Sequence, residues 1–306
     1  MEMTIKEYLL KTYSKSTLNS NLYNIKHFTD YFPGKPEKAD YRDILQYLEH
    51  LRKNCNLHPK TLKHRLYAVK IYFNYLLETG QRKDHPCSEL NLKDKINKQI
   101  QVDTLYSEQT LERFFETTCT SKRKHRLDNR NKIIVSLLVY QALTVTEIAK
   151  LTIQDISLEK GEIFIQSQEF HQQSRTLPLK AKQILLFHNY LSQDRPILLS
   201  YNKSDRAEYS FILGQYGEAI HPHQITRIIN EYRPENEKIQ PIKIRQSVIA
   251  NLLQKENDTR IVQVFAGHKR VSTTEQYRQS ELETLQAAVN QYHPLLHFFS
   301  IERKKF

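Results

Sequence analysis

The sequence predicts a mainly helical protein of two domains, with one small antiparallel β element in the second domain. Apolar residues recur every three to four positions along most of the chain, which is the spacing of amphipathic helices. Two short segments, at 161–165 and 176–179, have instead the alternating pattern of strands. A polar, charged stretch lacks both patterns, so we expect domains at 1–84 and 105–306 joined by a linker over 85–104.

The first domain is predicted to contain three amphipathic helices. The first carries apolar residues from Leu18 to Phe28 and ends before Pro33-Gly34. The second carries them from Ile44 to Leu51, with Asp40 as its N-cap. The third runs from Leu62 to Leu76 and ends near Gly80, because glycine commonly follows the last helical turn.

Basic residues line one face of the third helix. Lys60, Lys63, Tyr67 and Lys70 are three to four residues apart, so they share a face opposite the apolar stripe. Such a face could lie along a phosphate backbone, although solvated lysines are the commoner explanation of this pattern. We expect these three lysines to bind DNA because of the motifs described below.

The second domain is predicted to be helical apart from its two strands. Helix signals begin at Ser107, where a capping residue precedes Leu111 and two phenylalanines. A strongly apolar helix follows over 133–140, and one further amphipathic segment lies at 280–289. The strands at 161–165 and 176–179 are separated by a polar turn.

Composition restricts the class of protein. Lys and Arg total 46 against 34 acidic residues, a formal net charge of +12, which favours a polyanionic partner such as nucleic acid or an anionic membrane. The first residues lack the apolar core of a signal peptide, and no apolar run approaches the ~20 residues that span a bilayer. We therefore expect a cytoplasmic protein without a membrane partner.

Cysteine and glycine usage argues against metal and nucleotide sites. The three cysteines, Cys55, Cys87 and Cys119, are far apart and have no metal-ligand spacing. Six glycines occur in the whole chain and none forms a phosphate-cradling loop. We expect no cofactor and no bound metal.

The most informative stretch lies near the C-terminus. It contains Ile242-Lys243-Ile244-Arg245 and then Gly267-His268, followed by Thr273-Thr274-Glu275-Gln276-Tyr277. Arg245 lies 23 residues before His268, and His268 lies nine before Tyr277.

These residues resemble the boxes of the tyrosine recombinase (phage integrase) family, which read H-x-L-R and then L-G-H-x-x-x-x-T-T-x-x-Y. The segment 143–151 resembles the first box, L-R-x-x-E-L-x-x-L, and Arg175-Thr176-Leu177-Pro178-Leu179 resembles the R-x-V-P-L hairpin of the family. The segment 61–73 is similar to the N-terminal core-binding, SAM-like domain. The resemblance covers nearly the whole chain and implies a C-terminal domain of the recombinase catalytic type.

The resemblance implies cleavage of duplex DNA through a 3′-phosphotyrosyl intermediate. Tyr277 would be the nucleophile, while Arg245 and His268 would stabilise charge on the phosphate oxygens. Lys243, Lys269 and Arg270 lie within the same boxes, so we expect them to bind DNA.

Three positions depart from the pattern of the family. Thr144 replaces the arginine of the first box, Ile242 replaces the histidine of H-x-L-R, and the turn at 166–173 has no lysine. Losing the arginine costs roughly 10³-fold or more in phosphoryl transfer, and losing the general acid about 10²-fold or more. Arg175 on the hairpin is our candidate substitute. The alternatives are His171 on the hairpin, Lys180 just after it and Lys243 beside Arg245.

Two hypotheses follow from this mixture. The first is an active recombinase or integrase of a mobile element, in which neighbouring groups replace the missing ones. The second is a catalytically impaired or inactive relative that binds DNA as an accessory or regulatory protein. A generic helix-turn-helix repressor fits less well, because it explains neither the strand pair nor the T-T-x-x-Y element. We expect a free monomer that forms a tetramer on DNA through the C-terminal helix at 280–289.

Overall fold

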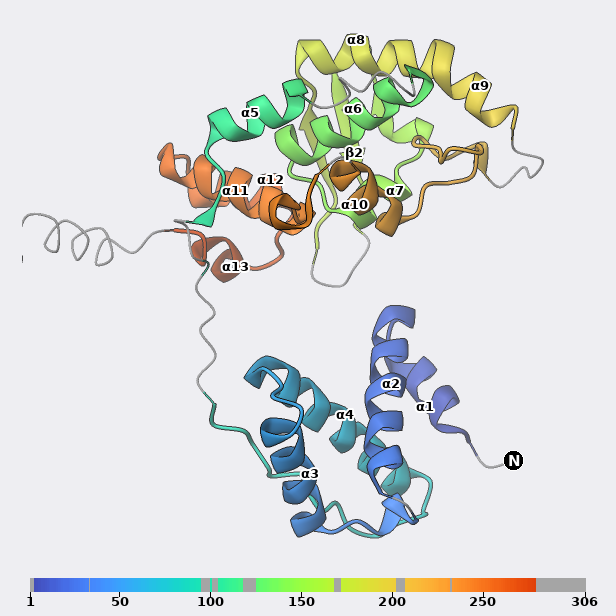
Figure 1. Cartoon of the computed structure of the whole chain (residues 1–306), viewed down its shortest axis with the longest axis vertical. Helices are drawn as coiled ribbons and strands as arrows, with labels where there is room; N and C mark the ends of the chain where they lie inside the picture. The colour runs from blue at the N-terminus through green and yellow to red at the C-terminus, as the bar shows by residue number, and fades with distance from the viewer. Residues whose placement is uncertain are drawn as a thin grey trace, which may run out of the picture. The chain divides into compact units, whose positions relative to one another are not determined.

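A computed structural model describes residues 3–32, 34–94, 100, 104–117, 125–167, 172–201, 207–231 and 233–278. Its contacts divide the chain into two compact units, Met1–Lys98 and Gln99–Phe306. Both are mainly helical, and the described strands form one three-stranded antiparallel sheet in the second unit. The predicted fold class is confirmed (Figure 1).

The first unit is a small helical bundle. Its helices are α1 (Ile5–Thr12), α2 (Lys15–Tyr31), α3 (Tyr41–Lys53) and α4 (Pro59–Glu78), with a 3-10 turn at Pro36–Lys38. Asp40 caps α3 by accepting a hydrogen bond from the Asp43 amide, as expected from its position. Helix α1 was not expected from the sequence, because its eight residues are too short to show a clear apolar period.

Apolar residues of all four helices form the core of the first unit. Phe28 of α2, Tyr47 of α3 and Phe73 of α4 are fully buried, and the Phe28 ring packs edge to face on each of the other two. The segment after α4 also contacts this core, since Cys87 is buried within it. Residues 85–94 therefore lie against the first unit, ahead of the division at Lys98.

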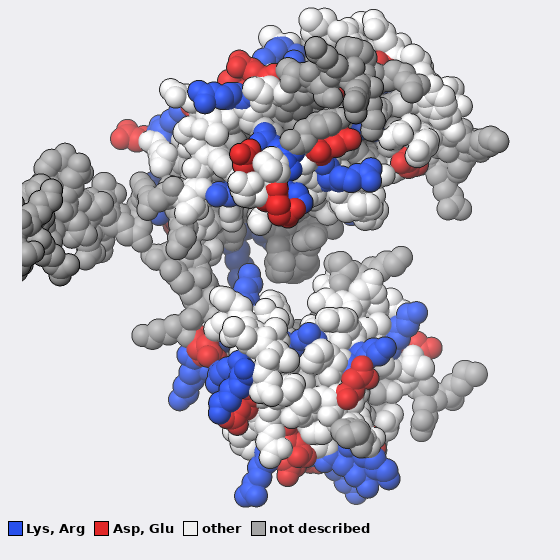
Figure 2. Space-filling model, viewed as in Figure 1, with Lys and Arg blue, Asp and Glu red and all other residues white. Residues whose placement is uncertain are grey.

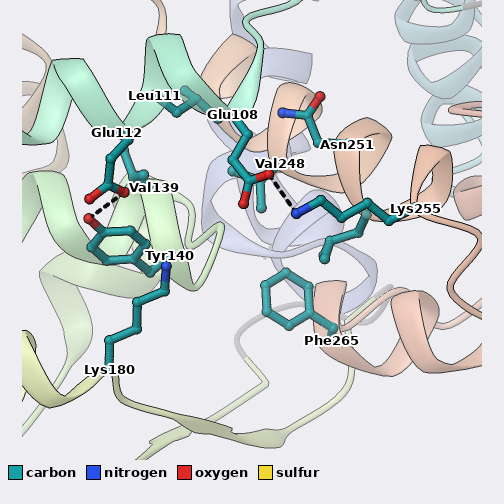
Figure 3. A pocket seen from close by; sticks show the side chains of 11 residues that line it. Glu108, Leu111, Glu112, Val139, Tyr140, Lys180, Val248, Asn251, Lys255 and Phe265 are labelled. Carbon is teal, nitrogen blue, oxygen red and sulfur yellow. Dashed lines mark hydrogen bonds and ion pairs between the residues drawn. The ribbon is translucent and has the colours of Figure 1, made fainter.

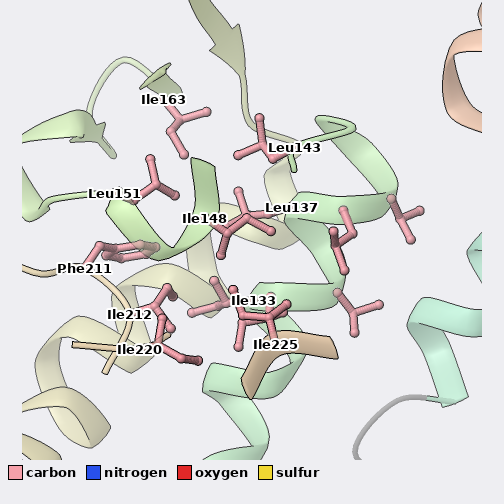
Figure 4. Close-up of a cluster of buried hydrophobic side chains, with 14 of the residues drawn as sticks. Ile133, Leu137, Leu143, Ile148, Leu151, Ile163, Phe211, Ile212, Ile220 and Ile225 are labelled. Carbon is pink, nitrogen blue, oxygen red and sulfur yellow. The ribbon is translucent and has the colours of Figure 1, made fainter. Parts of the chain in front are cut away.

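The second unit is built around α6 (His125–Tyr140). Its other elements are α5 (Glu108–Thr117), α7 (Val145–Lys150), a 3-10 turn (Ile153–Asp155), β1 (Ile156–Ser157), β2 (Glu162–Ile165), β3 (Arg175–Pro178), α8 (Ala181–Asn189), a π-helical turn (Tyr190–Asp194), α9 (Arg195–Leu199), α10 (Pro222–Asn230), a 3-10 turn (Glu235–Glu237), α11 (Pro241–Gln254), α12 (Thr259–Ala266) and α13 (Val271–Glu275). Side chains of α6, α7, β2 and α10 interlock in its main core (Figure 4).

The sheet has the order β1-β2-β3 with antiparallel pairing throughout. Along β2, Ile163 and Ile165 face the core, and Leu177 and Arg175 lie opposite them on β3. Because side chains alternate between the two faces of a strand, Arg175 belongs to the buried face. The pairing of these strands thus places a guanidinium group inside the unit.

Candidate active site

Arg245 lies on α11, and its guanidinium is held by the ends of two other helices. Its Nη1 donates to the Ala142 carbonyl, just after α6, and its Nη2 donates to the carbonyl of Ala266, the last residue of α12. Ala142 has a φ of 52° and is followed by the turn into α7. Carbonyls at helix C-termini carry partial negative charge, so both helix ends stabilise the buried cation.

Glu147 supplies the full negative charge near Arg245. It lies in the first turn of α7, where it forms a capping box with the N-cap residue Thr144. The Thr144 amide and hydroxyl both donate to Glu147 Oε2, at 2.7 and 3.0 Å. Its carboxylate also pairs with Arg175 at 2.8 Å and lies 3.9 Å from Arg245. One buried carboxylate therefore lies beside two guanidinium groups, and the three charges sum to +1.

Arg175 is buried against the turn that follows α12. Its Nη1 donates to Glu147 Oε1, while Nε and Nη2 have no hydrogen-bond acceptor in the described part of the chain. A Cβ on Gly267 would lie 2.5 Å from Arg175 Nη1, and Gly267 has a φ of 68°. Glycine at this position therefore allows both the left-handed end of α12 and the close approach of the arginine.

His268 and Tyr277 lie side by side after this turn. Their rings are stacked, with centroids 6.0 Å apart and an interplanar angle of 18°. His268 Nδ1 is 2.9 Å from the hydroxyl oxygen of Thr274, a buried residue of α13. The Tyr277 ring packs in an apolar cluster that includes Ile249 and Val262. Stacking and the threonine hydroxyl together fix the plane of the imidazole.

Burial and charge shift the titration of these groups. Burial lowers the pKa of His268 to about 4, helped by the charges of Arg245 and Arg175, so its imidazole is neutral at neutral pH. Burial raises the pKa of Tyr277, and the Arg245 charge acts in the opposite direction. Burial also raises the pKa of Glu147, but Arg175 and Arg245 outweigh this effect and the net pKa is lowered.

The structure thus brings together the four residues that the sequence singled out for catalysis. Arg175 of β3 and Arg245 of α11 meet at Glu147, and their charges act on His268 after α12, which stacks on Tyr277. The start of β3 is joined to the same turn, because the Gln173 amide donates to the Gly267 carbonyl at 3.0 Å.

The departures from the family pattern have clear local structures. Thr144 caps α7, and Ile242 on α11 is 51% exposed. Of the alternative cations, Lys180 lies over the Tyr140 ring and Lys243 lies over the Tyr106 ring. His171 is outside the described residues. Arg175 is therefore the candidate substitute that shares a carboxylate with Arg245.

The predicted DNA-binding residues differ in their exposure and in whether their amines already donate hydrogen bonds within the protein. Lys60 is exposed on α4, whereas Lys63 donates to the Asp94 carbonyl and Lys70 donates to the Ser88 carbonyl. Lys269 and Arg270 are exposed at the turn before α13, and Lys243 is half-buried. Figure 2 shows basic and acidic side chains interspersed on the viewed face.

Sequence reasoning missed the central role of Glu147 as a shared counter-ion. The signal that could have identified it is the spacing Thr144-x-x-Glu147, which matches a capping box at the start of a helix. A capping glutamate inside a motif that also carries arginines is a candidate ion-pair partner. Ala142 could not have been identified in this way, since its role depends on its backbone carbonyl.

A separate pocket of about 250 Å³ lies among α5, α6, α11 and α12 (Figure 3). Its apolar floor includes Leu111, Val248 and Phe265. On its rim, Lys255 pairs with Glu108 at 2.5 Å, and the Tyr140 hydroxyl donates to Glu112. None of the four candidate catalytic residues lines this pocket.

None of the helices in the described part of the chain combines the length and apolar composition that crossing a bilayer needs.

Comparison with curated proteins finds relatives over nearly the full length of the chain. It is 25% identical over 296 residues to the tyrosine recombinase XerC of Pelotomaculum thermopropionicum, covering 93% of this chain and 94% of that protein. It is 28% identical over 230 residues to the tyrosine recombinase XerD of Proteus mirabilis, covering 75% of this chain and 71% of that one.

Solved structures share the fold. The XerH site-specific recombinase bound to its difH substrate, in a pre-cleavage complex, matches with a TM-score of 0.66 and 22% identity, covering 90% of this chain and 78% of that one. A lambda integrase dimer bound to a COC′ core site matches with a TM-score of 0.64 and 14% identity, covering 90% and 75%.

Family models agree with these likenesses. The model of the phage integrase family matches residues 103–283, and that of the phage integrase N-terminal SAM-like domain matches residues 1–82. The first of these matches alone covers more than half of the chain. The chain therefore belongs to the phage integrase family, as the motifs in its sequence indicated.

Proposed function

We propose that this protein is a site-specific DNA recombinase or integrase of a mobile element, which cleaves and rejoins duplex strands through a 3′-phosphotyrosyl intermediate. The observation that carries the proposal is the pairing of Arg175 and Arg245 with one buried carboxylate, next to His268 and the Tyr277 ring stacked on it. Curated relatives of the chain are named tyrosine recombinases.

In this reaction the Tyr277 oxygen forms a bond to phosphorus, and the bond from phosphorus to the 5′-oxygen breaks. The phenol loses its proton, and the departing 5′-oxygen gains one. Neutral His268 is able to donate one N–H to a phosphate oxygen while its Nδ1 stays near Thr274. Rejoining is the reverse reaction with a new 5′-hydroxyl, so the phosphodiester energy is conserved.

The two arginines would stabilise the charge that develops on the phosphate. Nε and Nη2 of Arg175 lie on the same edge of the guanidinium, and both are without an acceptor among the described residues. Such an edge matches two phosphate oxygens bidentately. Glu147 would keep both arginines in place, because its carboxylate neighbours both of them.

Cleavage would require a rearrangement of the nucleophile. Tyr277 is 8% exposed and packs within an apolar cluster, where burial raises its pKa. We propose that DNA binding draws this side chain out of the cluster toward the phosphate, which would make the free protein a resting state.

A suicide substrate tests the proposed activity. A duplex selected by the protein from a random-sequence library is nicked near its centre, so that cleavage releases a short fragment and traps the covalent complex. Denaturing gels should show an adduct with the wild-type chain and none with Tyr277→Phe. The matched control is Tyr209→Phe, a change at a tyrosine that is 66% exposed, which should leave the adduct unchanged.

The second candidate function is a non-catalytic DNA-binding protein. It is favoured by Thr144, which caps α7 at the position where the family has an arginine. Retained binding with no adduct from the wild-type chain would support this alternative. Thr144→Arg would then test whether the missing arginine explains the absence of an adduct. Restoring the arginine should produce an adduct that is lost again in Tyr277→Phe.

We further propose that duplex DNA is the partner in the cytoplasm, and that Lys60, Lys63, Lys70, Lys243, Lys269 and Arg270 bind its phosphates. The protein would be a monomer when free and a tetramer on DNA, joined through residues 280–289, which lie outside the described residues. Sedimentation velocity with and without the selected duplex tests this assembly. A chain that ends after residue 278 should bind DNA but remain unassembled.

A further inference from the structure

Thr274 of α13 has a buried hydroxyl beside the imidazole of the candidate active site. The residue is 0% exposed, and its Oγ1 lies 2.9 Å from His268 Nδ1. Among the described residues this hydroxyl makes no other hydrogen bond. A hydroxyl has one proton to donate, and a buried donor without an acceptor is costly. The direction of this hydrogen bond therefore decides the state of the imidazole.

The usual alternative acceptor for a helical threonine is the carbonyl one turn earlier. Thr79 shows this pattern, because its hydroxyl donates to the Tyr75 carbonyl at 2.8 Å. Thr274 does not show it in the described part of the chain. The Arg270 carbonyl, four residues before Thr274, accepts instead from the Thr273 amide at 3.1 Å. The imidazole nitrogen is thus the acceptor that the described residues offer to the buried hydroxyl.

The surroundings of His268 keep its ring in place beside Thr274. The His268 amide donates to the Gln263 carbonyl at 3.0 Å, and Gln263 Nε2 donates back to the His268 carbonyl at 3.0 Å. The ring itself stacks on Tyr277. A flipped ring would turn a C–H toward the threonine oxygen in place of Nδ1, and the hydroxyl would lose its acceptor. The orientation with Nδ1 toward Thr274 is therefore the favoured one.

The imidazole of His268 is neutral and has one proton to place. Burial and then the charges of Arg245 and Arg175 lower its pKa to about 4. A neutral imidazole has one N–H and one nitrogen lone pair. An Nδ1 that accepts from a hydroxyl carries no proton, so the N–H must be at Nε2. The Nε2 atom makes no hydrogen bond within the described part of the chain.

We infer that Thr274 is a positioning residue for His268: its hydroxyl donates to Nδ1 and holds the imidazole in the tautomer with its proton on Nε2. The consequence for catalysis rests on the proposed function. An Nε2–H can donate to a phosphate oxygen, whereas the other tautomer would present a lone pair to it. With Nδ1 occupied and Nε2 protonated, His268 has no free lone pair. The proton of Tyr277 therefore has to leave to a different acceptor.

NMR of the full-length chain with nitrogen-labelled histidine, at neutral pH and without DNA, measures the tautomer. The ring of His268 is assigned among the 13 histidines as the one that disappears in His268→Gln. We expect Nδ1 to resonate as an unprotonated, hydrogen-bonded nitrogen and Nε2 to resonate as an N–H. A proton on Nδ1, or on both nitrogens, overturns the inference.

Thr274→Val removes the hydroxyl and keeps the branched shape of the side chain. Nδ1 should then resonate as an unprotonated nitrogen without a hydrogen bond. Cleavage of the suicide substrate should slow about tenfold at unchanged DNA affinity, because the imidazole is held less well. Thr274→Ser keeps the hydroxyl and should restore both readings. The matched control is Thr273→Val at the half-buried neighbouring threonine, which should leave the Nδ1 resonance of His268 unchanged.

Three results from the variants would overturn the role of Thr274. They are an Nδ1 resonance in Thr274→Val that equals that of the wild-type chain, an equal shift in Thr273→Val, and slow cleavage that Thr274→Ser does not restore. Where Thr274→Val does not fold, the spectrum of the wild-type chain decides. The spectra need no DNA, so a wild-type chain that forms no adduct refutes the proposed function and leaves the tautomer to be judged separately.

Discussion

Replacing Glu147 by glutamine should destabilise the second unit by about 3–5 kcal/mol at neutral pH. The side chain is 1% exposed, and its carboxylate is 2.8 Å from Arg175 and 3.9 Å from Arg245. Glutamine has nearly the same size and also serves in a capping box with Thr144. The substitution therefore removes the charge alone and leaves two buried guanidinium groups without their counter-ion.

The loss should depend on pH in a defined direction. The pKa of Glu147 in the folded state is lowered below its ordinary value of 4.5. A carboxylate with a lowered folded pKa contributes stability that is fully present above the unfolded pKa and is lost as the pH falls through the folded value. The difference between the wild-type chain and Glu147→Gln should therefore shrink as the pH falls below about 4.5.

Differential scanning calorimetry of the full chain measures this effect. At about 2–4 °C per kcal/mol, the transition of the second unit should fall by roughly 6–20 °C at neutral pH. Glu108→Gln is the control, because its pair with Lys255 is 63% and 57% exposed and should contribute about 1 kcal/mol at most. A loss no larger than that of the control, or one that stays constant in acid, would refute the role of Glu147.

Three further predictions concern single residues. Gly267→Ala should cost about 2 kcal/mol or more in urea unfolding, because its Cβ would meet Arg175. Gly80→Ala has a similar φ of 71°, and no atom of the described residues lies within 4 Å of its Cβ, so it should cost about 1 kcal/mol; equal losses would contradict this. Between pH 6.5 and about 4 the unfolded wild-type chain takes up a proton on His268 that the folded chain does not, so its stability falls by up to ~1.4 kcal/mol per pH unit. His268→Gln should flatten this fall, and an unchanged dependence of stability on pH would argue against the lowered pKa. Lys60→Ala should reduce the slope of log DNA affinity against log salt concentration by about 1. Lys70→Ala should reduce this slope less, because the Lys70 amine already donates to the Ser88 carbonyl; a larger reduction by Lys70→Ala would contradict this.

Local patterns in the sequence predicted most of the fold. The three helices expected in the first unit match α2, α3 and α4, because apolar spacing, the Asp40 cap and Gly80 act over a few residues. The strands at 162–165 and 175–178 were expected within one residue. Strand β1 was missed, since two residues carry no detectable period.

The candidate site was predictable only as a set of residue types. Motif spacing identified Arg245, His268 and Tyr277, but the partners that hold them come from distant parts of the chain. The carbonyl of Ala142 lies 103 residues from Arg245, and such a contact leaves no local pattern. For the same reason, sequence could not show that Lys63 and Lys70 donate to carbonyls of residues 88–94.

The hydrogen bond from Gln173 to Gly267 joins the β2–β3 hairpin to the turn that precedes His268. A second backbone bridge pairs Gln172 with His268 itself. Both bridges attach the hairpin to the backbone that carries the imidazole, and the imidazole stacks on the Tyr277 ring. In the proposed recombinase, a duplex that displaces residues 172–175 would therefore shift the stacked His268 and Tyr277 rings without touching them, so that DNA contact and the position of the proposed nucleophile would be coupled.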